Sequence, residues 1–410
     1  MRSRIAMVLF LVFFAYFFIG GIITYKLANV VSFAHYDFDY QIDLFRASLY
    51  AIAALGGFLL AYATLSYVRL ERKERHTPRK SDETLRVGNS QVIASIAVFL
   101  VGFVGALLMF REYGWRIPSF TVGSDEWRTQ ISSGLPQILY FHLVGAVLIS
   151  YALRNSATDK FQRRLFMGIM LVSLFIIYLG ASRSMLVTPI LVILIDQWCL
   201  KKLKTVWLFT AAFAAGLVVF VTGLLRMGSD SEQAIYLLRF VADVAPELRE
   251  FAKLLDYIPA RADFLHGQMF VNGVVIMIPG KLVALLGGVK EQLWQPFGEY
   301  LKNLYGYAFA GGGLRAGLIA EYYANFGLLG VILGFYGMGL LVRFVDVRIM
   351  QVRSTTRLFF LVVALSLATS TLFTFDGVIY KLVSFAAAWI VYSVVTFVVG
   401  MSTNRRTGVA

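Results

Sequence analysis

Apolar runs of about twenty residues recur along almost the whole chain, and this feature restricts the fold more than any other. A helix of that length crosses ~30 Å of hydrocarbon, where no water can satisfy an open backbone. Ten runs lie near residues 5–27, 46–68, 91–110, 136–153, 165–180, 184–200, 205–225, 314–340, 358–375 and 378–399. With 59% hydrophobic and 15% charged residues, the composition is not that of a soluble domain. The sequence therefore predicts an all-α polytopic membrane protein of about ten transmembrane helices, forming one membrane domain over residues 1–410.

Basic residues are concentrated in alternate connections between these runs. Such groups lie between residues 69 and 86, between 154 and 164, and at 201–204. Because cytoplasmic loops retain Lys and Arg, this pattern places both chain termini in the cytoplasm. The net charge of +14 is divided among separate inside segments and forms no single basic stripe, so it does not indicate nucleic-acid binding.

One connection, residues 226–313, is much longer than the others and is predicted to lie on the outer face. Loops of this length are usually functional. Its first half places apolar residues at helical spacing between charges, which predicts an amphipathic helix on the membrane surface. Its second half, residues 269–289, is apolar but interrupted by Pro279 and Gly280. We expect a re-entrant or in-plane element there.

Three arginines lie at the outer ends of predicted spans, namely Arg183, Arg226 and Arg315. Arg183 belongs to a tight hairpin, Gly180-Ala181-Ser182-Arg183-Ser184, between two apolar runs. The planar, permanently charged guanidinium group matches phosphate oxygens, so the set suits a diphosphate at the membrane surface. The alternative is that each arginine extends to lipid headgroups or pairs with a nearby carboxylate.

Several short motifs together resemble the bacterial O-antigen, or oligosaccharide repeat-unit, polymerases of the Wzy type. They are the Gly-Ala-Ser-Arg-Ser hairpin, an arginine after the next span, Ile278-Pro279 in the long loop, and Glu321-Tyr322-Tyr323-Ala324-Asn325-Phe326-Gly327. The resemblance covers roughly residues 165–345. It implies a bacterial inner-membrane glycosyltransferase with a C-type fold that needs neither a metal nor a cofactor. Such an enzyme transfers the glycan from one undecaprenyl diphosphate carrier to the non-reducing end of another repeat unit.

The chemistry of this reaction then suggests roles for particular residues, and the reaction itself implies partners. The expected diphosphate-binding residues are Arg183, Arg226, Arg315 and Lys281, the expected catalytic residues are Glu321, Asp230 and His266, and the expected sugar-binding residues are Tyr322, Asn325 and Trp294. Glu321 is the first choice of base, and its alternative is a salt bridge with one of the arginines. For His266 the alternative is a polar loop residue, and for the aromatic rings it is an interfacial belt. The expected partners are the lipid-linked oligosaccharide, membrane lipid and a chain-length regulator protein.

Two other activities remain as alternatives. One is a ligase of the same broad fold that moves finished glycan to a different acceptor. The other is a flippase or transporter of lipid-linked oligosaccharides, which needs charged residues along a path through several spans. Here the centres of the predicted spans are almost free of charge and the ionisable residues gather at one end, which favours surface chemistry over transport.

Overall fold

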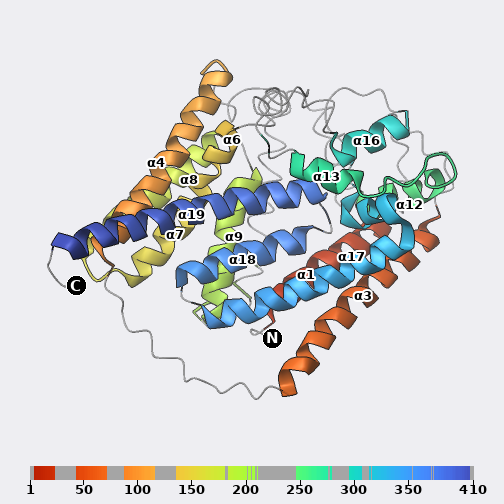
Figure 1. Cartoon of the computed structure of the whole chain (residues 1–410), viewed down its shortest axis with the longest axis horizontal. Helices are drawn as coiled ribbons and strands as arrows, with labels where there is room; N and C mark the ends of the chain where they lie inside the picture. The colour runs from red at the N-terminus through yellow and green to blue at the C-terminus, as the bar shows by residue number, and fades with distance from the viewer. Residues whose placement is uncertain are drawn as a thin grey trace. The chain divides into compact units, whose positions relative to one another are not determined.

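The computed structural model describes about two thirds of the chain, and every element in that part is a helix (Figure 1). The described residues are 4–23, 43–71, 87–115, 135–180, 183–200, 246–275, 295–306, 316–352, 354–370 and 374–406, with a few single positions between them. The first helices are α1 (Ile5–Ala15), its π-helical continuation η1 (Tyr16–Gly20), α3 (Leu44–Glu71), α4 (Asn89–Glu112), α6 (Leu135–Tyr140), α7 (His142–Ser156), α8 (Lys160–Leu179) and α9 (Arg183–Cys199). The later ones are α12 (Glu247–Tyr257), α13 (Gln268–Val275), α16 (Phe297–Leu304), α17 (Gly317–Gln351), α18 (Ser354–Thr369) and α19 (Phe375–Arg406).

Seven of these helical stretches are long and apolar enough to cross a membrane. They are Ile5–Ile23, Leu44–Thr64, Asn89–Glu112, Pro136–Ser156, Lys160–Leu179, Gly317–Ile349 and Gly377–Ser402, and two shorter apolar helices cover Met185–Cys199 and Thr355–Thr369. The polytopic, helical membrane architecture is therefore confirmed. The predicted span at 205–225 lies outside the described residues, so the count of ten spans stays a prediction.

The chain divides into two compact units, each built from several segments. The first unit comprises Met1–Glu74, Leu224–Met350 and Val363–Tyr380, and the second comprises Arg75–Gly223, Gln351–Val362 and Lys381–Ala410. The prediction of one membrane domain over the whole chain stays a prediction, and we describe each unit by itself.

In the first unit, α1, α3 and α17 lie side by side (Figure 1). The Phe10 ring of α1 stacks on Phe58 of α3 at 3.9 Å and meets Phe335 of α17 at 6.1 Å, centroid to centroid. A Cβ atom added at Gly339 would collide with the carbonyl oxygen of Phe58, so glycine lets α17 approach the α3 backbone. Aromatic packing and a small residue thus hold three helices that are far apart in the sequence.

One end of this three-helix packing is closed by Asp346 of α17, which is 1% exposed. Its carboxylate accepts the backbone N–H of Ala6 at 2.7 Å, that of Met7 at 3.2 Å and the Tyr62 hydroxyl at 2.9 Å. The first N–H groups of a helix have no partner within that helix, and a capping side chain normally accepts them. Asp346 therefore caps α1 from a position 340 residues away in the sequence.

The short helix α12 packs inside the first unit against α3 and η1. Four of its five charged residues, Glu247, Arg249, Glu250 and Lys253, are buried, and Asp256 in its last turn is partly exposed. Arg249 pairs with Glu250 at 2.9 Å, and the Lys253 ammonium lies 4.4 Å from the centre of the Tyr305 ring. The end of the amphipathic pattern thus forms a helix whose charged residues are covered by other parts of the protein, and its position on the membrane surface stays a prediction.

The second unit is organised around α7, almost every residue of which is buried. Gly145 of α7 leaves room for Ala388 of α19, and Ile149, Phe166 and Ala388 belong to one apolar cluster. A buried ion pair ties α18 to α9, since Nε of Arg357 lies 2.8 Å from Oδ1 of Asp196. The Tyr151 hydroxyl of α7 also donates to Asp196 at 3.2 Å. The buried carboxylate in this unit is therefore matched by a cation and a hydrogen-bond donor, as burial of charge requires.

Candidate functional site

The Glu321–Gly327 motif contains a break in α17. Gly327 has φ 65° and ψ −156°, a region of backbone space that only glycine occupies readily. In an unbroken helix the carbonyls of Ala324 and Asn325 would accept N–H groups four positions ahead. Here they accept the N–H groups of Leu265, at 2.9 Å, and of His266, at 3.1 Å. The break therefore turns the α17 backbone into a binding surface for another segment, residues 258–268, which we call the docked loop.

The side chain of Asn325 strengthens this attachment. Its Oδ1 atom accepts the N–H of Gly267 at 2.9 Å and that of Met269 at 3.4 Å. Its Nδ2 group donates to the Glu321 carbonyl at 2.8 Å, within α17 itself. Asn325 is completely buried, so these bonds form away from water. The amide that was expected to bind sugar is thus engaged in holding the docked loop.

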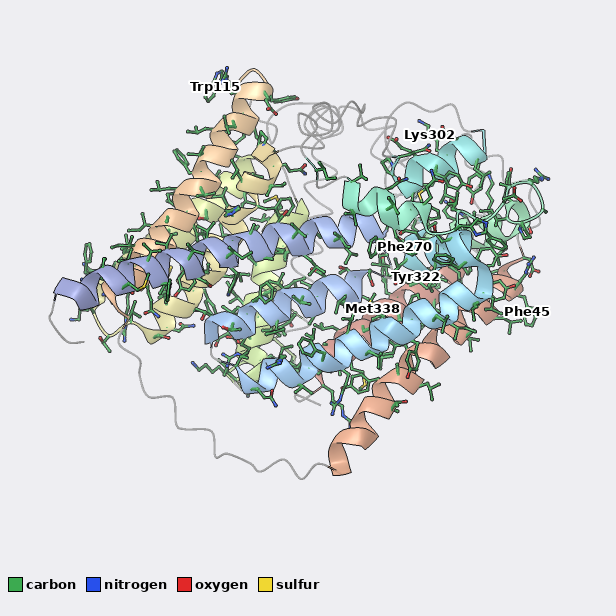
Figure 2. All side chains as sticks on the ribbon, in the orientation of Figure 1. Phe45, Trp115, Phe270, Lys302, Tyr322 and Met338 are labelled. Carbon is green, nitrogen blue, oxygen red and sulfur yellow. The ribbon has the colours of Figure 1, made fainter. Side chains whose placement is uncertain are left out.

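The two tyrosines of the motif pack against the same region. The Tyr323 hydroxyl donates to the Ile258 carbonyl at 3.0 Å, at the start of the docked loop. The Tyr322 ring lies 5.3 Å from that of Phe270 (Figure 2) and 5.9 Å from that of Phe335. Phe270 in turn meets Phe375, the first residue of α19, at 4.8 Å. Tyr322, a predicted sugar-binding residue, is therefore part of an aromatic cluster that joins α13, α17 and the start of α19.

Glu321 is 1% exposed, and its Oε2 atom accepts the backbone N–H of Phe375 at 2.6 Å. Phe375 begins α19, and a carboxylate at a helix N-terminus is stabilised by the free N–H groups and the helix dipole. The motif thus fixes two neighbours at once, the docked loop through Asn325 and the start of α19 through Glu321.

His266 is exposed at the turn of the docked loop. Its φ of 46° and the φ of 91° at the following Gly267 show a tight left-handed turn. A histidine adopts such a conformation only where its surroundings enforce it, and here the bonds to Asn325 do so. Among the predicted catalytic residues, His266 is therefore exposed on a fixed backbone, whereas Glu321 is buried.

The hairpin that carries Arg183 is as short as predicted, because α8 ends at Leu179 and α9 begins at Arg183. The buried Tyr140 holds the end of α8, donating its hydroxyl to the carbonyls of Ile176 and Ile177 at 3.3 and 3.2 Å. Gly180 is needed here because a Cβ atom would collide with the Tyr140 oxygen. The sequence did not single out Tyr140, and the only signal was the motif glycine that accommodates it.

The remaining predicted site residues lie outside the part of the chain that the structure describes. This holds for the Arg183 side chain and for Asp230, Arg226, Lys281, Trp294 and Arg315. Their predicted roles stay predictions.

A comparison with protein families gives one match that covers almost the whole chain. The family model described as O-antigen polysaccharide polymerase Wzy matches residues 1–406. No curated protein and no solved structure matches the chain. The matched range contains the first compact unit, all but the last four residues of the second, and every predicted site residue.

Proposed function

The chain belongs to the O-antigen polysaccharide polymerase Wzy family, and from this membership we propose a detailed reaction for it. The family consists of multi-pass inner-membrane enzymes that act on lipid-linked oligosaccharide repeat units. In our proposal, this chain moves a glycan from one undecaprenyl diphosphate carrier to the non-reducing end of another, on the outer face of the membrane. The family match over residues 1–406 is the observation that carries the proposal.

The bond that breaks joins C1 of the glycan to a diphosphate oxygen, which leaves with the bonding electron pair. The hydroxyl oxygen of the acceptor sugar forms the new bond to C1 and gives up its proton to a base. Negative charge grows on the diphosphate, and fixed cations stabilise that change most when they are already in place. We assign this role to Arg183, Arg226 and Arg315, with Lys281 as a fourth cation.

The start of α9 supports the assignment of Arg183. Arg183 is the first residue of α9, so its backbone belongs to a helix N-terminus that presents free N–H groups. Such an end attracts anions, whereas a cation there is unfavourable unless an anion is bound. The position thus favours an anionic ligand at the hairpin.

We assign the proton-accepting role to His266 and a positioning role to Glu321. His266 is exposed on a held turn, whereas Glu321 is buried and already accepts the Phe375 N–H. Asn325 has a positioning role as well, because its amide holds the docked loop. Asp230 is the second candidate for the base, and Tyr322 and Trp294 are the candidates for sugar contact.

The decisive experiment uses purified protein and defined undecaprenyl diphosphate repeat units in a buffer with excess chelator. We expect a ladder of products that differ by one repeat unit. A single transfer to an unrelated acceptor would indicate a ligase, and movement of intact lipid-linked units across vesicles without a ladder would indicate a flippase. A ladder that appears only after a divalent metal is restored would contradict the metal-independent reaction. Adding a chain-length regulator protein is expected to narrow the distribution of ladder lengths.

Variants then test the assigned residues. Arg183→Ala is expected to abolish the ladder, while Arg348→Ala, an exposed arginine near the Asp346 end of α17, keeps it. His266→Ala is expected to lose turnover. Glu321→Gln keeps an acceptor oxygen for the Phe375 N–H and is expected to retain most of the turnover. If Glu321→Gln is inactive at normal stability and His266→Ala is active, the two roles are reversed.

A further inference from the structure

A group of charged side chains lies where the start of α3 meets the end of α12, both in the first unit. It consists of Asp43 and Arg46 at the start of α3, Asp256 in the last turn of α12, and Arg261 in the docked loop. All four side chains reach solvent at least in part. None of them has a role in the diphosphate site described above. We call this group, together with the rings of Tyr50 and Tyr257, the mixed-charge patch.

The arginines of the patch are held over aromatic rings. The guanidinium carbon of Arg46 lies 5.8 Å from the centre of the Tyr50 ring, and that of Arg261 lies 4.8 Å from the centre of the Tyr257 ring. A cation over a ring face is attracted to it, and the Arg46 side chain also forms a hydrogen bond with Tyr50. The two arginines therefore present donors in fixed orientations.

Each of these two rings packs on another tyrosine ring. Tyr50 packs on Tyr323 of the Glu321–Gly327 motif at 5.5 Å, and Tyr257 packs on Tyr305 at 4.9 Å. The N–H of Arg261 also bonds to the Tyr257 carbonyl at 2.7 Å, which folds the docked loop back against the end of α12. The patch thus rests on the same residues that hold the docked loop, which also carries His266.

The acidic residues of the patch provide acceptors. Asp43 caps α3, accepting the N–H of Arg46 at 2.9 Å, and is otherwise exposed. Burial raises the pKa of Asp256 above its usual range, and the charge of Asp43 acts in the same direction, whereas Arg46 and Arg261 oppose it. The packing of α12 on α3 and the bond from the Arg261 N–H to the Tyr257 carbonyl bring the end of α12, with Asp256, next to the segments that carry the two arginines. The patch contains two cations and two anions, so it has no net charge.

A surface of this kind suits a ligand that has many hydroxyl groups and no strong charge. A hydroxyl group both donates and accepts hydrogen bonds, so it can bind the carboxylate of Asp256 and a guanidinium group together. A diphosphate would be attracted by the arginines but repelled by Asp43 and Asp256. The chemistry of the patch therefore fits sugars better than the anionic part of the lipid carrier.

The position of the patch agrees with a sugar attached to a lipid. The apolar span of α3 begins at Leu44, and the neighbouring Phe45 is 75% exposed at this end of the helix (Figure 2). An exposed aromatic ring at the end of a span is typical of the membrane–water interface. With both termini in the cytoplasm, as the basic residues predict, this end of α3 lies on the outer face, where a lipid-linked glycan leaves the membrane.

We propose that the mixed-charge patch is a glycan subsite that binds hydroxyl groups of the repeat unit through Asp256, Arg46 and Arg261. This proposal rests on the proposed polymerase function and adds a binding site to it. The subsite would place the glycan against the docked loop, whose backbone the Glu321–Gly327 motif fixes. It would affect substrate affinity rather than the chemical step.

The test measures binding of the repeat-unit oligosaccharide without its lipid and diphosphate, released from lipid-linked intermediates by mild acid. The full chain is placed in lipid nanodiscs and titrated with this oligosaccharide by calorimetry. Asp256→Asn and Arg46→Gln are each expected to weaken binding by about tenfold or more, the effect of losing a charged hydrogen-bond partner. Glu299→Gln, which alters an exposed carboxylate of α16 outside the patch, is expected to leave the affinity unchanged.

Kinetics with the lipid-linked substrate provide the second measurement. The patch variants are expected to raise KM by a similar factor while kcat stays within about twofold, as loss of uniform binding predicts. If Arg46→Gln or Asp256→Asn does not fold, the exposed Arg261→Gln decides the question by the same two measurements. Wild-type binding that the variants do not weaken, or no wild-type binding of the oligosaccharide, would overturn the subsite. If the wild type binds the oligosaccharide but makes no ladder, the polymerase proposal fails and the subsite stands.

Discussion

The two ends of α17 use buried polar groups in opposite ways. At the C-terminal end, Asp346 accepts two N–H groups of α1 and the Tyr62 hydroxyl, so its carboxylate serves the packing of three helices. At the N-terminal end, Asn325 and the carbonyls near Gly327 hold the docked loop, which carries the exposed residues Arg261 and His266. The C-terminal end joins α17 to α1 and α3, and the N-terminal end holds a loop with the exposed side chains of Arg261 and His266.

This difference shows why a buried charge in a membrane helix does not by itself indicate catalysis. Ionisable residues at such depth are often functional. Yet Asp346 caps a helix, Asp196 pairs with Arg357, and Glu321 accepts the first N–H of α19. The exposed groups on the docked loop are better candidates for contact with substrate than these buried carboxylates.

Asp346→Ala, at the C-terminal end of α17, is expected to have the largest effect on stability. This variant leaves two buried donors and one partly buried donor without an acceptor, and we expect a loss of about 3–5 kcal/mol in the free energy of unfolding. Asp346→Asn keeps one acceptor oxygen and is expected to lose less than half of that. The measurement is unfolding in detergent micelles. As a control, Asp159→Ala removes an exposed cap of α8 and costs about 1 kcal/mol. Equal losses at Asp346 and Asp159 would contradict the structural role of Asp346.

The second-largest effect is expected from replacing the glycine at the break in α17. Gly327→Ala forces a side chain into a backbone conformation that disfavours it, at a cost of about 1–3 kcal/mol. The variant is also expected to lose polymerase activity, because the carbonyls that hold the docked loop move. Gly337→Ala is the matched control, since a Cβ atom at that helical position meets nothing within 4 Å. The free energy of unfolding and the yield of the product ladder would be compared. Equal values for Gly327→Ala and Gly337→Ala would contradict the role of the break in holding the docked loop.

Asn325→Ala separates the holding of the docked loop from the folding of the helices. We expect a loss of about 1–3 kcal/mol. In hydrogen exchange the amides of Gly267 and Met269 are expected to exchange faster, while those of Ala6 and Met7 stay protected. Asn325→Asp keeps the Oδ1 acceptor and is expected to restore most of the protection. Uniformly faster exchange at both ends of α17 would mean that the two ends are not independent.

The smallest effect is expected from Tyr323→Phe. It removes the hydrogen bond to the Ile258 carbonyl and keeps the ring contacts, so the loss is about 0.5–1.5 kcal/mol. Tyr300→Phe serves as the control, because the hydroxyl of Tyr300 has no hydrogen bond among the described residues. Thermal unfolding compares the two. A loss that is no larger for Tyr323 than for Tyr300 would remove this bond from the description of the docked loop.

The sequence predicts the helices of this protein well because apolar length alone determines a span. The run at 91–110 corresponds to Asn89–Glu112, and the run at 165–180 to Lys160–Leu179. The predicted span at 314–340 corresponds to a longer helix, α17. The helix continues to Gln351, since Asp346 finds its partners on α1 and α3. Hydropathy records the charge of Asp346 but not the donors that compensate for it.

The candidate site could be predicted only in part. The sequence analysis proposed Arg183, Glu321, Asn325 and His266 as site residues, and the two helices that the predicted hairpin joins are found. The sequence did not reveal that Asn325 holds His266, because that contact joins residues far apart in the chain and depends on the break at Gly327. The mixed-charge patch was missed for the same reason. Its residues belong to segments more than 200 positions apart, and no spacing rule connects them.

The way in which α17 holds the docked loop has a consequence for how such an enzyme can change over generations. Every bond from the Asn325 side chain and from the freed carbonyls to residues 265–269 is made with a backbone N–H group. The attachment is therefore largely indifferent to the side chains that the segment carries. Apart from the left-handed positions at 266 and 267 and the buried Met269, this segment can exchange residues while the membrane-embedded helices keep their sequence.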